Sequence, residues 1–141
     1  MRRTRPRVRV RLPPPLLDRA RRARVALEVG AGGRFETALA LREANPRARW
    51  IVSDVDERVL AAPAVLEPRL VDVLRPDLEA LRGVDLVYAV RLPEELQLAA
   101  SRLASALGAD LALRALKDEW AELGPRRHVV WPDGWRYWPI G

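Results

Sequence analysis

The sequence predicts an α/β protein with a minimal Rossmann-like fold, in which a mostly parallel sheet is closed by a C-terminal β-hairpin. Three observations lead to this class. From Arg24 onward, short apolar runs alternate with helical patterns, as in a parallel sheet covered by helices on both faces. The first apolar run ends in a glycine-rich turn at residues 30–33. Near the C-terminus, Pro132, Asp133 and Gly134 separate two β-type runs, which is typical of a hairpin.

Five parallel strands are expected from the apolar runs. In chain order they occupy residues 24–29, 49–54, 69–72, 85–90 and 110–115. Each run is short and mainly apolar, because a parallel strand is covered on both of its faces. The aromatic hairpin that follows is expected to lie antiparallel beside the fifth of these strands.

The clearest helical pattern spans residues 93–107. Pro93 stands at its first position, Glu94 and Glu95 suit the positive end of the helix dipole, and Gly108 follows the last apolar residue. Two further helices, the second of them short, are expected at residues 35–44 and 117–123.

The positive charge of the chain is concentrated at its N-terminus. Ten arginines and one aspartate lie within residues 1–24, whereas the remainder carries 15 basic and 18 acidic residues. We therefore expect a basic, flexible arm over residues 1–15 and one Rossmann-like domain over residues 16–141. The proline-rich residues 12–17 resemble a stiff spacer. The alternation of arginine with apolar residues at 7–12 also fits an edge strand with a charged outer face.

The composition excludes several kinds of protein and of site. No apolar run approaches the ~18 residues of a membrane span, and the opening residues lack the apolar segment of an export signal. A soluble, cytoplasmic protein without membrane partners is therefore expected. The chain has no cysteine and one histidine, His128. Disulfides and thiolate or histidine-rich metal sites are thus excluded, and no metal cofactor is expected.

The glycine-rich turn after the first strand indicates a ligand site. A dinucleotide fingerprint that started at Gly30 would require glycine at position 35, where the chain has Phe35. This difference counts against a nicotinamide or flavin nucleotide. The second strand ends in Asp54, 24 residues beyond Gly30, where an acidic side chain is placed to bind ribose hydroxyls. A small nucleoside-type ligand is expected, and its identity stays open on these grounds.

The stretch "LEVGAGG" resembles the first motif of class I S-adenosylmethionine-dependent methyltransferases, and "IVSDVD" is similar to their second motif. The resemblance implies a class I methyltransferase-like fold with S-adenosylmethionine as the cofactor. It also implies a role for each of six residues: Glu28 near the methionine amino group, Gly30 and Gly32 for close backbone approach, Asp54 at the ribose, Val55 against adenine, and Asp72 at the adenine amino group.

A closer resemblance extends over the body of the chain. The "EVGAGGR" turn, the segment "DLVYAVRLPEEL" and the aromatic C-terminal hairpin are similar to those of an uncharacterised archaeal family of the UPF0146 type. This resemblance implies the fold and the cofactor, and it implies no substrate.

The acidic side chains near the turn provide a physical argument for S-adenosylmethionine as the cofactor. S-adenosylmethionine carries a sulfonium and an ammonium group, so a mouth ringed by Glu28, Asp54 and Asp72 would suit it. Arg34 opposes this argument, because an arginine at the start of a helix favours an anion.

Catalytic residues are indicated only weakly. Arg91 follows the fourth strand and could clamp an anionic acceptor, and Glu94 could take a proton. In structural terms, Arg91 would instead pair with Glu28 or Asp72, and Glu94 would belong to a first helical turn. The leading hypothesis is an S-adenosylmethionine-binding, methyltransferase-like protein. The alternative is a non-catalytic module that binds nucleic acid through the arginine-rich residues 2–24.

Overall fold

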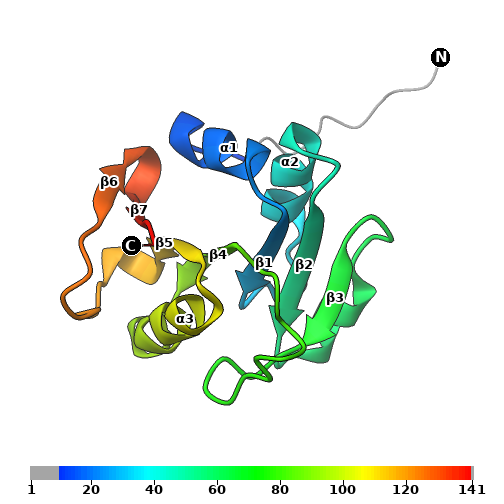
Figure 1. The fold of residues 1–141 in the computed structure, drawn as a ribbon. Coiled ribbons are helices and arrows are strands. Elements are labelled where there is room, and N and C mark those ends of the chain that lie inside the picture. The colour runs from blue at the N-terminus through cyan, green and yellow to red at the C-terminus, as the bar shows by residue number, and fades with distance from the viewer. Residues whose placement is uncertain (1–9, 141) are drawn as a thin grey trace.

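The computed structural model describes residues 10–140 and contains one seven-stranded sheet flanked by helices (Figure 1). The strand order is β3-β2-β1-β4-β5-β7-β6. Neighbouring strands are parallel except at β7, which is antiparallel to both β5 and β6. The fold class expected from the sequence is confirmed, including the hairpin and its antiparallel position beside β5.

The strands are β1 (Val25–Val29), β2 (Arg49–Asp54), β3 (Glu67–Leu70), β4 (Leu86–Leu92), β5 (Asp110–Ala115), β6 (Val129–Trp131) and β7 (Trp135–Trp138). The α-helices are α1 (Pro14–Arg21), α2 (Glu36–Ala44) and α3 (Glu94–Leu107), and the 3-10 helices are η1 (Glu57–Ala61), η2 (Leu116–Asp118) and η3 (Pro132–Gly134). Among residues 10–140, no helix is long and apolar enough to cross a membrane.

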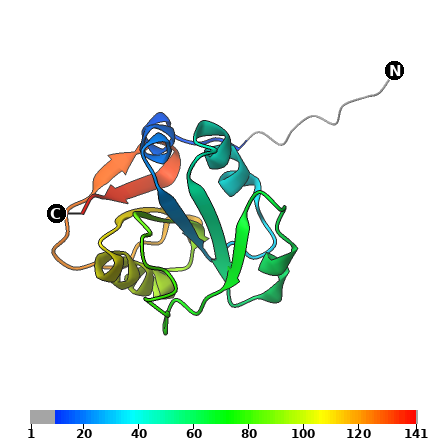
Figure 2. The same ribbon diagram turned by 45° about the vertical axis from the view of Figure 1, so that its right-hand side comes forward.

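The sheet separates two apolar cores. On one face, Leu16 of α1 and Leu41 of α2 pack with Trp50 of β2. On the other face, Leu103 of α3 packs with Leu27 of β1. Ala26, the residue before Leu27, faces the first core. Figures 1 and 2 accordingly place α1 and α2 together, with α3 across the sheet from them. This alternation of side chains along β1 directs Glu28 to the α1 and α2 side.

The edge strand β3 lies two residues earlier than the sequence predicts. It starts at Glu67 rather than at position 69, and it includes Pro68. Proline cannot donate a ladder hydrogen bond, but at an edge position this costs little. The apolar pattern alone did not reveal that the third strand is the edge of the sheet.

Two other predicted segments differ from the structure. Residues 14–17, interpreted as part of a stiff spacer, begin helix α1, because prolines are tolerated in a first turn whose N–H groups have no helical partner. Residues 117–123 form no helix. Only the short η2 occurs there, and Lys117 and Asp118 have positive φ angles. The side chain of Gln97 instead holds this segment, donating to the Glu119 carbonyl at 2.8 Å and accepting from the Ala121 N–H at 2.9 Å.

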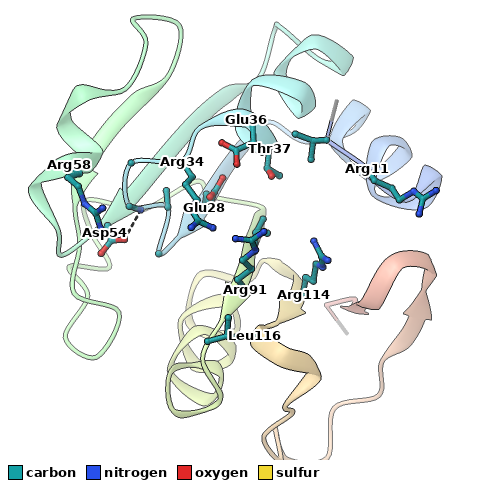
Figure 3. Close-up of a pocket in the computed structure, with 16 residues that line it drawn as sticks. Arg11, Glu28, Arg34, Glu36, Thr37, Asp54, Arg58, Arg91, Arg114 and Leu116 are labelled. Atoms are coloured by element: carbon teal, nitrogen blue, oxygen red, sulfur yellow. Dashed lines mark hydrogen bonds between the residues drawn. The ribbon is translucent and has the colours of Figure 1, made fainter. Parts of the chain in front are cut away.

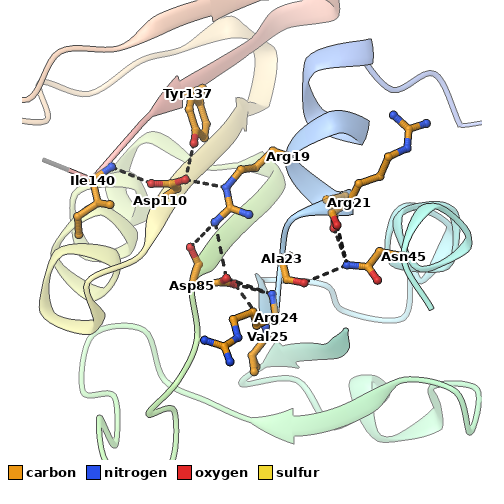
Figure 4. Close-up of polar contacts among 11 residues, drawn as sticks. Arg19, Arg21, Ala23, Arg24, Val25, Asn45, Asp85, Asp110, Tyr137 and Ile140 are labelled. Atoms are coloured by element: carbon orange, nitrogen blue, oxygen red, sulfur yellow. Dashed lines mark hydrogen bonds and ion pairs between the residues drawn. The ribbon is translucent and has the colours of Figure 1, made fainter. Parts of the chain in front are cut away.

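Helix α1 is fixed to the sheet by a buried polar cluster (Figure 4). The Arg19 guanidinium donates to the Asp110 carboxylate at 2.6 Å and to the Asp85 carbonyl at 2.9 Å. Tyr137 of β7 donates to the same Asp110 carboxylate, and so does the Ile140 N–H, at 2.7 Å. The cluster joins α1, β4, β5 and β7, so Arg19 is a structural residue.

The expected N-terminal arm lies mainly outside the described residues. The flexible arm, the edge strand and most of the nucleic-acid-binding segment were predicted for residues that include 1–9. For those residues the three interpretations stay predictions. Within the described part, residues 10–12 are not in a strand, and α1 begins at Pro14.

Candidate functional site

A candidate site lies where the order of the sheet reverses. From β1 the chain continues to β2 and β3 on one side, and it then returns to β4 on the other side of β1. In open α/β sheets, the carboxyl ends of the strands at such a switch point form a ligand crevice. A cavity of about 780 Å³ occurs at this place (Figure 3). It is lined by Val10, Arg11, Glu28, Gly30, Ala31, Gly32, Gly33, Arg34, Glu36, Thr37, Asp54, Arg58, Val90, Arg91, Arg114 and Leu116.

The glycine turn forms one wall of the cavity. Gly30 and Gly32 have φ angles of +72° and +57°, a region that favours glycine. The Gly32 N–H donates to Oδ2 of Asp54 at 2.7 Å, and the Asp56 N–H donates to Oδ1 at 3.1 Å. Asp54 therefore joins the turn after β1 to the turn after β2, and its carboxylate lies at the cavity edge.

Glu28 is a buried acid in the cavity wall. Its side chain is 3% exposed, and its Oε1 has no hydrogen-bond partner among the described residues. Burial raises the pKa of Glu28 to about 8, while the Tyr88 hydroxyl acts against this rise and the charges of Glu36 and Asp54 add to it. Tyr88 is the register partner of Glu28 on β4, and its buried hydroxyl lies beside the Glu28 carboxyl without a hydrogen bond of normal geometry. An uncompensated polar pair of this kind inside a protein is destabilising.

The N-terminus of α2 forms a second wall. Glu36 and Thr37 of its first turn line the cavity, and no side chain caps this end of the helix. The first N–H groups of a helix have no intrahelical acceptor, and they carry a partial positive charge. Thr37 is 6% exposed, so its hydroxyl belongs to the buried part of this wall.

Arginines dominate the charge of the cavity. Five of its lining residues are arginines and three are acidic. Arg58 pairs with Asp56 at 2.7 Å, and Arg11 lies 3.9 Å from Asp133. Within residues 10–140, the guanidinium groups of the other three have no acidic partner; these are Arg34, Arg91 and Arg114. In Figure 3 they project toward the middle of the cavity from three separate segments. The expectation of an acidic mouth is therefore wrong.

Arg91 sits at an irregularity of β4. The pairing of β4 with β5 shifts between Val90 and Leu92, and Arg91 has a φ angle of +58°. A residue with a side chain pays on the order of 1–3 kcal/mol to adopt this conformation. Arg91 forms no ion pair with Glu28 or Asp72, so the structural pairing considered from the sequence is not observed.

The structure brings together four of the six residues that the resemblance assigned to the cofactor. Glu28, Gly30, Gly32 and Asp54 all line the cavity. The other two lie outside its lining. Val55 follows Asp54 and is 67% exposed. Asp72 lies in the loop after β3, where its carboxylate accepts the Leu74 N–H at 2.9 Å.

The two catalytic candidates differ in their position. Arg91 lines the cavity, whereas Glu94 is an exposed residue of the first turn of α3 and lies outside the lining. Sequence reasoning missed Arg114 and Thr37. Arg114 lies near the carboxyl end of β5, on the same side of the sheet as the carboxyl ends of the other parallel strands. Its position in the predicted strand could therefore have indicated that it borders the cavity. Thr37 gave no signal beyond its place in a first helical turn.

No group of three or more His, Cys, Asp or Glu side chains that could hold a metal ion occurs within residues 10–140.

Comparison with known proteins gives a family and a fold. Residues 11–130 match the family model described as "Uncharacterised protein family (UPF0146)". A UPF0146 protein of Halobacterium salinarum strain R1 is 35% identical over 66% of this chain and 69% of its own length. A UPF0146 protein of Methanocaldococcus jannaschii is 28% identical over 65% of this chain, and the match spans 66% of its length.

Several solved structures have a similar fold. A SAM-dependent methyltransferase from Aquifex aeolicus superimposes with a TM-score of 0.60 and 18% identity, over 84% of this chain and 82% of that one. Cofactor-bound Rv0187 from MTB also gives a TM-score of 0.60, with 20% identity over 96% of this chain and 83% of that one. PigF with SAH gives 0.50 and 16% identity, over 65% of this chain and 31% of that one. The fold is thus methyltransferase-like.

Proposed function

The chain belongs to the UPF0146 family, and from that premise we propose that it binds S-adenosylmethionine, or its demethylated product S-adenosylhomocysteine, in the cavity at the carboxyl ends of β1, β2 and β4. One observation carries the proposal. The cavity wall contains the buried carboxyl of Glu28, whose Oε1 accepts no hydrogen bond of normal geometry from the described residues, although Tyr88 lies beside it. The amino group of either compound is a cation that could supply the missing partner.

The remaining residues of the glycine turn fit the same ligand. The two carboxylate oxygens of Asp54 each accept one backbone N–H and retain lone pairs for ribose hydroxyls. Gly30 and Gly32 leave the backbone accessible beside them. Val55 and Asp72, which lie outside the cavity lining, are proposed as contacts of the adenine, because they follow the carboxyl ends of the neighbouring strands β2 and β3.

Bound S-adenosylmethionine would supply an electrophilic methyl group, and methyl transfer is the second, finer part of the proposal. The chain's own contribution would be to hold the acceptor and exclude water. Arg91 borders the cavity and is our candidate for acceptor binding, whereas the exposed position of Glu94 outside the lining makes it a weaker candidate.

Calorimetry with S-adenosylhomocysteine tests the binding proposal. Asp54→Ala should weaken binding by about 1–3 kcal/mol, because the charge-assisted hydrogen bonds to the ribose are lost. Glu28→Gln should weaken it by a similar amount. The matched control is Glu57→Gln, which removes an exposed carboxylate outside the cavity and should leave affinity unchanged. Thermal melts check that each variant is folded.

Proton release gives a second and independent readout. At pH 7 the Glu28 carboxyl is mainly protonated, because burial raises its pKa to about 8. A cation that binds beside it should displace this proton, so the binding heat should depend on the ionisation enthalpy of the buffer. The dependence should disappear in Glu28→Gln. Absence of binding by either compound at millimolar concentration, or tight binding of a nicotinamide dinucleotide instead, would refute the proposed function.

A further inference from the structure

Three cavity arginines take no part in the proposed binding of the cofactor, and of these only Arg91 has been considered as a contact of the acceptor. Arg34 follows the glycine turn, Arg91 occupies the irregular position of β4, and Arg114 lies near the end of β5. None of the three has an acidic partner within the described part of the chain. All three are exposed residues that line the same cavity, whereas the lining residue Arg58 pairs with Asp56. Three unpaired cations around one cavity repel one another unless an anion joins them.

The position of these arginines separates them from the proposed cofactor contacts. In Figure 3, Asp54 and Arg58 lie on the β2 side of the cavity, whereas Arg91 and Arg114 lie across it on the β4 and β5 side. Arg34 projects between the two sides. A ligand held by Glu28 and Asp54 therefore leaves the β4 and β5 side for a second molecule.

The N-terminus of α2 adds neutral donors and a favourable dipole to this anionic preference. Its first turn contributes uncapped N–H groups, and the buried Thr37 contributes a hydroxyl to the same cavity. Helix N-termini and guanidinium groups both bind phosphate in proteins. Glu36 is the exposed acid of this wall and makes no ion pair with the three arginines. The three guanidiniums and Glu36 leave a net positive charge that matches a doubly charged phosphate monoester.

We propose that Arg34, Arg91, Arg114 and the N-terminus of α2 bind the phosphate group of a small phosphorylated molecule, which would be the methyl acceptor. The role of this molecule as an acceptor rests on the proposed function, whereas the phosphate site itself does not. The strained φ angle of Arg91 agrees with the proposal, because the irregularity directs a guanidinium into the cavity at a cost to the fold.

Calorimetry with glycerol 3-phosphate as the probe tests the site, first on the free protein and then on protein saturated with S-adenosylhomocysteine. Arg91→Met and Arg114→Met should each weaken phosphate binding about tenfold or more, because each removes a charge-assisted pair of hydrogen bonds. The matched control is Arg47→Met, which removes an exposed arginine outside the cavity and should leave binding unchanged. Arg114 has regular strand geometry, so its variant tests the site even where Arg91→Met alters the fold.

The outcomes separate this inference from the proposed function. Two results together would support the site. Phosphate binding should persist when S-adenosylhomocysteine is bound, and it should weaken in Arg91→Met and Arg114→Met but not in Arg47→Met. Displacement of the phosphate by S-adenosylhomocysteine would overturn the inference, because the arginines would then serve the carboxylate of the cofactor. An equal loss in Arg47→Met, or binding of succinate in preference to phosphate, would overturn it too. Phosphate binding without any binding of S-adenosylhomocysteine would leave the site intact and refute the proposed function.

Discussion

Replacement of Glu28 by glutamine should stabilise the ligand-free protein, and the gain should grow with pH. In the folded chain the pKa of this buried carboxyl is about 8, against an ordinary value of 4.5. Between these two values the folded state holds a proton that the unfolded state has released. The free energy of unfolding therefore falls as pH rises through this window, by about 1.4 kcal/mol per pH unit.

The size of the effect follows from the width of the window. Full ionisation costs the wild-type protein at most about 5 kcal/mol relative to acidic pH, which is comparable with the whole stability of many domains. Glutamine keeps the shape and carries no charge at any pH. The two proteins should differ little in stability near pH 5, and Glu28→Gln should be more stable by several kcal/mol near pH 8.5.

Urea unfolding at pH 5.5, 7 and 8.5 measures this difference. Glu57→Gln is the control, because it removes an exposed carboxylate outside the cavity and should change stability by no more than ~0.5 kcal/mol. Parallel stability curves for wild type and Glu28→Gln over this range would refute the reasoning, since Glu28 could not then be a buried acid. The expected result would mean that the protein keeps a destabilising carboxyl which a cationic ligand would use.

Two further predictions concern the irregular strand position and the buried polar cluster. Arg91→Gly should be more stable than Arg91→Ala by about 1 kcal/mol, because only glycine adopts a φ angle of +58° without strain; equal urea midpoints would contradict the strained backbone. Asp110→Asn should cost about 3–5 kcal/mol, because Arg19 would keep only the Asp85 carboxylate, 3.9 Å away, as an acidic partner. Burial alone would raise the pKa of Asp110, but hydrogen bonds from Tyr137, the Ile140 N–H and Arg19 outweigh it and lower that pKa. The wild-type advantage over Asp110→Asn should thus persist above pH ~4 and vanish as the pH falls through the lowered pKa, as acid titration followed by circular dichroism would measure; an advantage that does not change with pH would contradict this account.

The sequence predicted the regular elements where local chemistry and tertiary structure agree. The glycine turn, the hairpin turn at Pro132 and the helix after Pro93 each have residues that favour one backbone conformation. Helix α1 was missed because its prolines suggest an extended spacer unless the burial of Leu16 is known. The segment after Lys117 was predicted as a helix although its conformation depends on Gln97, which is distant in sequence.

The sequence predicted the part of the candidate site that the two recognisable motifs supply. Glu28, Gly30, Gly32 and Asp54 could be read from two adjacent stretches, because the first two strands are neighbours in the sheet. Arg34 and Arg91 were also placed near this turn from the sequence, whereas Arg114 was not. Whether Arg114 has an acidic partner depends on the side chains that the fold brings around it, and neither composition nor spacing records that arrangement.

The buried cluster around Arg19 also sets an order for folding. Its partners Asp85, Asp110 and Tyr137 lie far along the chain, the first of them 66 residues beyond Arg19. On the ribosome α1 is synthesised before the strands that anchor it, and the anchor is completed only when β7 has emerged. We expect α1 to remain undocked on a chain stalled before Tyr137 and to become protease-resistant once that strand is released. Helix α1 would then join the sheet after elements that are synthesised later, and contacts this distant in sequence slow folding.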